Sequence, residues 1–143
     1  VEPGVEKHSV LRSERAIDRC DVALVVLDAD EGFTAQDQHV AGYVVERSKG
    51  IVFIVNKWDL VEKDNSTMNE FREQASEMFQ FSPWAPIVFV SALTGQRVDR
   101  IMETALHVFG ERQKRVTTGE MNRLLREAVA KHPPPSRPSR WVK

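Results

Sequence analysis

Uninterrupted apolar runs alternate along this chain with segments in which apolar residues recur at helical spacing. Three of the runs, at residues 22–27, 51–55 and 86–90, are rich in β-branched side chains. Runs of this length suit strands that are covered on both faces, as in parallel sheets. Helical spacing before, between and after them predicts the order helix, strand, helix, strand, helix, strand, helix. This alternation indicates an α/β fold with a parallel sheet and flanking helices.

Capping residues and glycines predict where the helices begin and end. Thr34 is expected to cap one helix, with an acidic residue in its first turn, and Gly50 to end it. Ser66 is expected to cap the helix between the second and third strands. Gly110 is expected to close the helix that follows the third strand.

The second run ends in a polar tetrad, Asn56-Lys57-Trp58-Asp59. In parallel sheets ligands bind just beyond the carboxyl ends of strands, which is where this tetrad falls. It resembles the N-K-x-D loop of GTP-binding proteins at every fixed position. Asp59 can accept hydrogen bonds from both N1–H and the N2 amine of guanine. Adenine lacks the N1–H and would leave this carboxylate partly unpaired, and sites of this type reject such analogues by about 10⁴–10⁵.

The other three residues of the tetrad have separate expected roles. Asn56 carries a donor and an acceptor, so it can bond the N7 edge of the base and connect neighbouring loops. Lys57 is expected to lay its methylene stem over the base while its ammonium stays in water. Trp58, at the variable position, is expected to pack beside the pocket or on the surface. The alternative is that the tetrad only turns a strand into a loop, since Asn and Asp favour turns.

A second loop supports guanine recognition. The third run ends in Ser91-Ala92-Leu93-Thr94-Gly95, which resembles the S-A-K/L loop of GTP-binding proteins. A backbone N–H, here that of Ala92, meets guanine O6 in such loops and would oppose the adenine amine. The residues expected to bind the guanine base are therefore Asn56, Lys57, Trp58, Asp59, Ser91 and Ala92.

The overall composition is ordinary for a soluble protein. The 143 residues include 20 basic and 21 acidic side chains and a single cysteine. One cysteine excludes an internal disulfide and fits a reducing cytoplasm. Cys20 is interpreted as a small buried hydrophobe. No apolar run approaches the length of a membrane span.

An acidic stretch, Asp28-Ala29-Asp30-Glu31-Gly32, follows the first run. Three carboxylates in four positions are compatible with a metal site. A solvated turn is the favoured interpretation, because the calcium-loop spacing of carboxylates does not follow.

The charge changes sign towards the end of the chain. Residues 111–143 hold nine basic and three acidic side chains (net +6), whereas the first 110 residues have a net charge of −7. This asymmetry predicts two parts, residues 1–112 and 113–143. Thr117 to Glu120 resembles a capping box that opens a helix, and His132 with the prolines at 133–135 is expected to stop it. The basic segment at 136–143 suits either phosphate contact or a solvated surface.

Five segments together resemble the bacterial double-GTPase family Der, also called EngA. They are VEKHSVLRSERAI, DADEGFTAQD, NKWDLVEKD, APIVFVSALTGQRV and LREAVAKHPPP. The resemblance is to the second GTPase domain of the family running into its KH-like domain. It implies a P-loop NTPase-like fold, GTP or GDP as ligand and GTP hydrolysis by the parent protein. It also implies a cytoplasmic role in assembly of the large ribosomal subunit, with ribosomal RNA as partner.

Motifs that the family places upstream are not found in this sequence. It contains neither the G-x-x-x-x-G-K-[ST] phosphate loop nor the D-x-x-G of the second switch. Catalytic residues and ligands for Mg²⁺ are therefore not expected in this chain, which we expect to be a fragment unable to hydrolyse GTP by itself. The family's first strand would lie beside the run at 22–27. Without it we expect an unpaired edge that makes the chain marginally stable or self-associating.

Other functions remain possible from sequence alone. An RNA-binding adaptor acting through the basic C-terminal segment would show salt-dependent RNA affinity that survives mutation of Asp59. A generic nucleotide-binding α/β enzyme would show no preference for guanine. A circularly permuted GTPase would need a phosphate loop after Ser91, and none follows.

Overall fold

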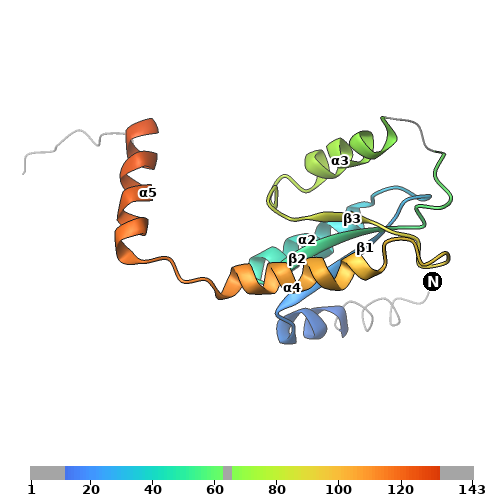
Figure 1. Ribbon diagram of the computed structural model, residues 1–143, viewed down its shortest axis with the longest axis horizontal. Coiled ribbons are helices and arrows are strands. Elements are labelled where there is room, and N and C mark those ends of the chain that lie inside the picture. Colours follow the sequence, from blue (N-terminus) through green and yellow to red (C-terminus); the bar gives the residue numbers. More distant parts are fainter. Residues whose placement is uncertain (1–11, 63–65, 133–143) are drawn as a thin grey trace, which may run out of the picture. The chain divides into compact units, whose positions relative to one another are not determined.

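The computed structural model describes residues 12–62 and 66–132 (Figure 1). The chain divides after Arg112 into two compact units, and each is described by itself. The entry segment at residues 1–9 and the basic segment at 136–143 lie outside the described residues.

The first unit contains a sheet of three parallel strands. They are β1 (Val22–Asp28), β2 (Gly50–Asn56) and β3 (Ile87–Phe89), in the order β1-β2-β3. The register pairs Val22 with Gly50 at one end and Asp28 with Asn56 at the other. The carboxyl ends of β1 and β2 therefore meet at one edge of the sheet, as expected for an α/β fold (Figure 1).

Helices cover both faces of this sheet. Besides a helical segment at residues 12–19, they are α2 (Ala35–Glu46), α3 (Thr67–Met78) and α4 (Asp99–Gln113). Phe53 and Val55 of β2 pack in a core with side chains of α2, α3 and the segment at 12–19. Val52 and Ile54 point the opposite way, into a second core with side chains of α4. Because successive strand residues face opposite sides, both faces require apolar residues, which explains the uninterrupted run.

The prediction that Gly50 ends the helix capped by Thr34 is wrong. Helix α2 ends at Glu46, and the turn after it uses Ser48, whose φ is 54°. Gly50 instead begins β2, where a Cβ would lie 2.8 Å from Cγ1 of Val108 and 2.9 Å from Cδ of Arg112. Glycine is needed there because α4 approaches the strand backbone closely. The capping box expected at Thr34 is confirmed.

Two further helix ends differ from expectation. Helix α4 passes through Gly110 and ends at Gln113. The Arg112 guanidinium donates hydrogen bonds to the carbonyls of Asp21 and, at 2.8 Å, of Ser48. These tertiary contacts hold the last turn in place despite the low helix propensity of glycine. Ser66 is the N-cap residue of α3, as expected, but its hydroxyl donates to the Glu70 carboxylate and its side chain makes no capping bond to the backbone.

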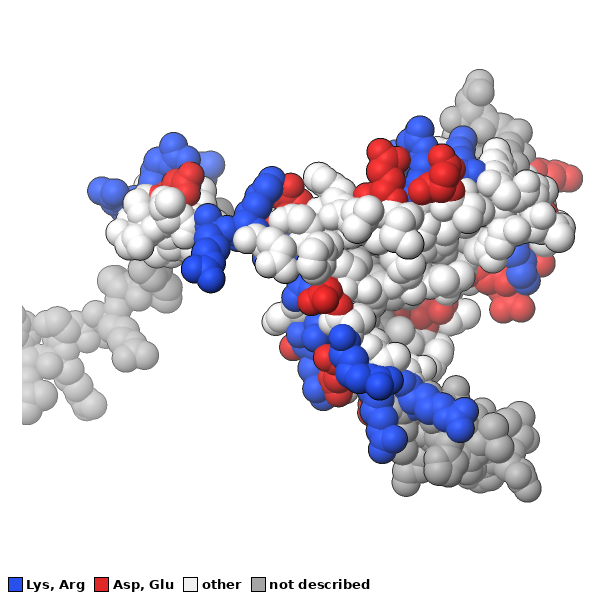
Figure 2. All heavy atoms as spheres, turned by 60° about the horizontal axis from the view of Figure 1, so that its bottom comes forward, with Lys and Arg blue, Asp and Glu red and all other residues white. Residues whose placement is uncertain are grey.

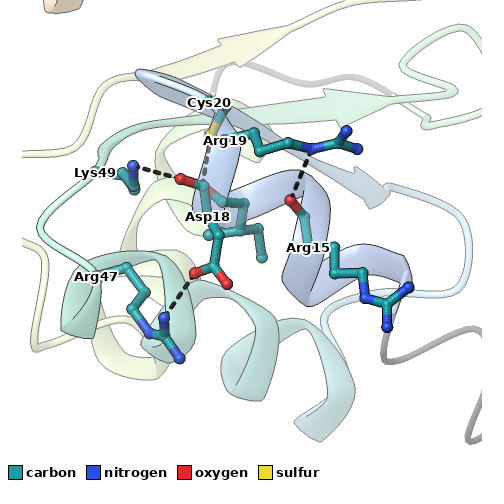
Figure 3. A network of polar contacts seen from close by, with 7 residues as sticks. Arg15, Asp18, Arg19, Cys20, Arg47 and Lys49 are labelled. Carbon is teal, nitrogen blue, oxygen red and sulfur yellow. Dashed lines mark hydrogen bonds and ion pairs between the residues drawn. The ribbon is translucent and has the colours of Figure 1, made fainter.

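Polar contacts attach the helical segment at 12–19 to the loop between α2 and β2 (Figure 3). Arg47 forms an ion pair of 2.7 Å with Asp18, and the Lys49 ammonium donates to the Asp18 carbonyl at 2.9 Å. The half-buried thiol of Cys20 donates to the Ile17 carbonyl at 3.3 Å. The segment's position against the sheet is therefore set by charged side chains at its end as well as by Ile17 in the core.

β1 forms one edge of the sheet and is only partly covered. Among the described residues it pairs with β2 alone. Leu24 and Val26, which point away from the first core, are 42% and 60% exposed. The edge strand thus presents both an open backbone and apolar side chains.

The second unit contains one described helix, α5 (Thr118–Lys131). Its expected capping box is present, since Thr117 accepts from the Glu120 backbone and Glu120 accepts from the Thr117 N–H. His132 follows as the C-cap. Met121, Leu124, Leu125 and Val129 are exposed and share one face of the helix by their spacing.

Candidate functional site

The candidate site lies where β2 and β3 end. We call residues 56–59 the base loop and residues 91–95 the second loop. Two hydrogen bonds connect the base loop to this part of the chain. The Trp58 N–H donates at 3.0 Å to the carbonyl of Val90, the residue before the second loop, and the Ala92 N–H donates to Oδ1 of Asn56 at 3.0 Å. The structure therefore brings together the two sequence motifs that were expected to share a ligand.

Asp59 has an oxygen whose hydrogen-bonding capacity is unused. Its Oδ1 is buried and accepts no hydrogen bond from any described residue. A buried acceptor without a donor costs about 1–3 kcal/mol, and more when it is charged. A ligand that supplies a donor to this oxygen would remove that cost. This is the behaviour expected of the carboxylate that accepts from a purine edge.

Asn56 and Ala92 already contact each other. The Ala92 N–H, expected to meet guanine O6, is engaged by the Asn56 side chain. A base that bonds to this N–H must share it with Asn56 or displace that bond. Asn56 does connect the neighbouring loops, which is one of the roles expected for it.

Trp58 and Ser91 support the loops from inside. The Trp58 side chain is 2% exposed, and its ring centroid lies 4.5 Å from that of Phe89 and 5.1 Å from that of Phe71. Ser91 is fully buried, and its hydroxyl accepts from the Thr94 N–H at 3.1 Å. Both side chains thus shape the site through packing and turn geometry.

Lys57 reaches across to the neighbouring strand. Its backbone has a φ of 61°, in the left-handed region, and its Nζ lies 2.5 Å from Oδ2 of Asp28. The bond to this lysine holds the pKa of Asp28 below its ordinary value, and the same bond raises the pKa of Lys57. The pair remains intact across the neutral range.

Asp28 was missed as a site residue in the sequence. Its stretch was interpreted as a solvated turn, and its carboxylate does accept from the backbone N–H groups of Asp30 at 2.9 Å and Glu31 at 3.3 Å. The parallel pairing of the two strands could have identified it, because Asp28 ends β1 directly opposite Asn56, the first residue of the base loop. Among the described residues, no group of three His, Cys, Asp or Glu side chains is arranged to hold a metal ion.

No helix in the described part of the chain has both the length and the apolar character needed to cross a bilayer.

Comparison with known families and proteins is consistent with this geometry. The family model described as "Elongation factor Tu GTP binding domain" matches residues 3–111. GTPase Der of Thermomicrobium roseum is 55% identical over 145 residues, covering 100% of this chain and 32% of that protein. GTPase Der of Chloroflexus aggregans is 53% identical, covering 94% of this chain and 30% of that protein. The chain thus spans about a third of the length of these curated relatives.

A solved structure shares the fold at lower identity. It is Era in complex with MgGDPNP and nucleotides 1506–1542 of 16S ribosomal RNA, with a TM-score of 0.61 and 22% identity. The similarity covers 71% of this chain and 33% of the Era chain. The three-stranded parallel sheet and its helices therefore share the fold of this Era structure.

Proposed function

Because this chain belongs to the Elongation factor Tu GTP binding domain family, we propose that its base loop and second loop hold the guanine base of GTP or GDP. The parent we propose is a GTPase similar to GTPase Der. Residues 1–112 would supply the base-binding half of its GTPase domain, and residues 113–143 the start of a KH-like domain. The observation that carries the proposal is the buried Oδ1 of Asp59, which lacks a donor among the described residues.

The proposed contacts follow from donor and acceptor chemistry. Asp59 takes the two donors of the guanine edge, N1–H and the N2 amine. Asn56 bonds the N7 edge, and Lys57 covers one face of the base with its stem. The Ala92 amide meets O6 by sharing its N–H with Oδ1 of Asn56 or by releasing that bond, while Trp58 and Ser91 hold the two loops in shape.

Substitution of Asp59 tests this assignment. Asp59→Asn replaces an acceptor with an amide that can also donate, which suits the C2 carbonyl of xanthine. In a full-length GTPase Der chain carrying this segment, we expect affinity for GDP to fall by about 10²–10⁴-fold, as two charge-assisted hydrogen bonds are lost. Affinity for xanthosine diphosphate should rise. Calorimetric titration with both nucleotides measures the change in preference.

A matched control separates base recognition from loss of charge. Glu103→Gln makes the same acid-to-amide change at an exposed position of α4. It should leave both affinities as in the unsubstituted protein. Retention of the original guanine preference by the Asp59→Asn protein would contradict the proposed function.

The activity and partners of the parent protein are also proposals. We place GTP hydrolysis in the full-length cytoplasmic protein, with Mg²⁺ and catalytic residues held by segments outside this chain. The proposed partners are the large ribosomal subunit and its RNA. Support comes from the GTPase Der relatives and, for RNA in general, from the similar fold of Era solved with ribosomal RNA.

Binding to ribosomal subunits tests this partner. Full-length protein loaded with a non-hydrolysable GTP analogue should cosediment with purified large subunits, and this binding should weaken as salt rises. Equal binding to large and small subunits would exclude the proposed specificity. Loss of binding in the Asp59→Asn protein, with recovery on xanthine nucleotide, would exclude an adaptor that needs no nucleotide.

A further inference from the structure

We propose that Asp28 is a positioning residue of the base site, whose carboxylate holds the Lys57 ammonium so that the lysine stem is set over the base. The inference rests on the proposed function, because it requires a base beside Lys57. It assigns a role to Asp28, which belongs to neither the base loop nor the second loop. Asp28 itself is not expected to touch the nucleotide.

The sheet places Asp28 where it can act on Lys57. Asp28 is the last residue of β1 and pairs with Asn56, the last residue of β2. The Ala29 N–H donates to the Asn56 carbonyl at 3.0 Å, so the pairing continues one residue past Asp28. Lys57 directly follows β2, and its ammonium lies 2.5 Å from the Asp28 carboxylate.

The two oxygens of Asp28 have separate partners. Oδ1 accepts from the backbone N–H groups of Asp30 and Glu31, which fixes the carboxylate in the turn after β1. Oδ2 is left to accept from Lys57. A carboxylate that is anchored by its own turn is a rigid acceptor. The Lys57 ammonium is therefore held at a fixed position at the end of β1.

Lys57 also needs such an anchor. Its left-handed backbone, with φ at 61°, is an uncommon conformation for a residue with a Cβ. The Leu60 N–H donates to the Lys57 carbonyl at 3.0 Å and closes the turn. Lysine side chains lose much rotamer freedom on binding, and a stem that is already held loses less. The bond to Asp28 would therefore prearrange the stem for the face of a base.

The Asp28→Asn variant isolates this function. An asparagine Oδ1 can still accept from the turn, whereas its Nδ2 replaces the oxygen that receives Lys57. In a full-length GTPase Der chain carrying this segment, we expect affinity for GDP to fall about three- to fivefold, the range for a partly exposed ion pair. Affinity for inosine diphosphate should fall by the same factor, since a stem contacts the face of either base. The ratio of the two affinities should stay unchanged.

A double-mutant cycle with Lys57→Met tests whether Asp28 acts through Lys57. Adding Asp28→Asn to Lys57→Met should cause no further loss of GDP affinity. Asp30→Asn is the matched control: it removes an exposed carboxylate from the same turn and should leave GDP affinity unchanged. Thermal unfolding of each variant establishes that it is folded.

The outcomes separate the two proposals. Independent, additive losses in the cycle, an unchanged GDP affinity in Asp28→Asn, or an altered ratio of GDP to inosine diphosphate affinity would each overturn the role of Asp28. Absence of any guanine preference in the unsubstituted protein would overturn the proposed function instead. If Asp28→Asn does not fold, the NMR titration of Asp28 in the Lys57→Met protein decides. A pKa of Asp28 that is no higher there than in the unsubstituted protein would overturn the pairing, since the backbone bonds from Asp30 and Glu31 lower this pKa in both proteins.

Discussion

Two carboxylates near the same edge of the sheet differ in whether their oxygens have hydrogen-bond donors. Both oxygens of Asp28 have donors, Oδ2 from Lys57 and Oδ1 from the backbone of its own turn. Asp59 has a buried oxygen without a donor among the described residues. At the residue scale this difference separates Asp28, the proposed positioning residue, from Asp59, the residue proposed to bind the base.

The ion pair of Asp28 predicts a dependence of stability on pH. The pKa of Asp28 is lowered from 3.8, chiefly by the hydrogen bond from Lys57. A group with a depressed folded-state pKa contributes stability above its unfolded pKa and loses it as pH falls through the folded pKa. The unsubstituted chain should therefore be more stable than Asp28→Asn near neutral pH, and this difference should shrink as pH falls below 3.8 and through the lowered folded-state pKa of Asp28.

Urea unfolding of both proteins across the acid range measures the effect. The pKa of Lys57 is raised from 10.5 in the folded chain. The stabilisation that its charge contributes is therefore fully present below 10.5 and is lost as pH rises through the folded-state pKa. The difference should accordingly also shrink in strong alkali. A difference that stays constant from acid to neutral pH would contradict the pairing.

At the scale of elements, one glycine decides how closely a helix approaches a strand. Gly50 faces α4 at distances that leave no room for a Cβ, and Arg112 of α4 bonds to the carbonyl of Ser48 just before it. Gly110 lies within α4 and has open space where a Cβ would be. A Cβ would therefore clash with neighbouring side chains at Gly50, whereas one could be added at Gly110 without a clash.

Alanine substitutions at these glycines should change stability in opposite directions. Gly50→Ala is expected to destabilise the first unit by about 1–3 kcal/mol through overpacking. Gly110→Ala should stabilise it by up to about 1 kcal/mol, because alanine favours the helix. Denaturant unfolding of the two variants provides the comparison, and a stabilised Gly50→Ala protein would show that α4 can move away at little cost.

At the scale of the molecule, the first unit leaves the β1 edge of its sheet incompletely covered. A groove of about 500 Å³ follows β1 and is lined by side chains of β1, α2 and the helical segment at 12–19. Figure 2 shows a surface of this unit on which uncharged residues form a broad area between the charged side chains. Leu24 and Val26 of β1 are exposed apolar residues of the same unit. An open edge strand with apolar side chains favours association with another chain.

We therefore predict that the isolated chain self-associates. Val26→Lys places a charge on the exposed side chain of the edge strand and should shift the chain towards monomer in sedimentation velocity runs. Val116→Lys, a similarly exposed valine between α4 and α5, is the matched control and should leave the association unchanged. A monomeric unsubstituted chain with a cooperative, high thermal transition would exclude the prediction.

Local patterns were sufficient for much of this protein. The three strands, the order of the elements, and the capping boxes at Thr34 and Thr117 could be predicted because period, turn chemistry and capping depend on residues close together in sequence. The base loop and the second loop were recognisable for the same reason. Both follow directly from the strands that carry them.

Only the tertiary structure decided the contacts between elements. The pairing of Asp28 with Lys57, the engagement of the Ala92 amide by Asn56, and the need for glycine at position 50 all join residues far apart in the chain. Helix α4 continues past Gly110 because Arg112 is anchored outside its own helix. Sequence determined which segments form and which groups they carry, whereas strand register and helix approach determined which of those groups meet.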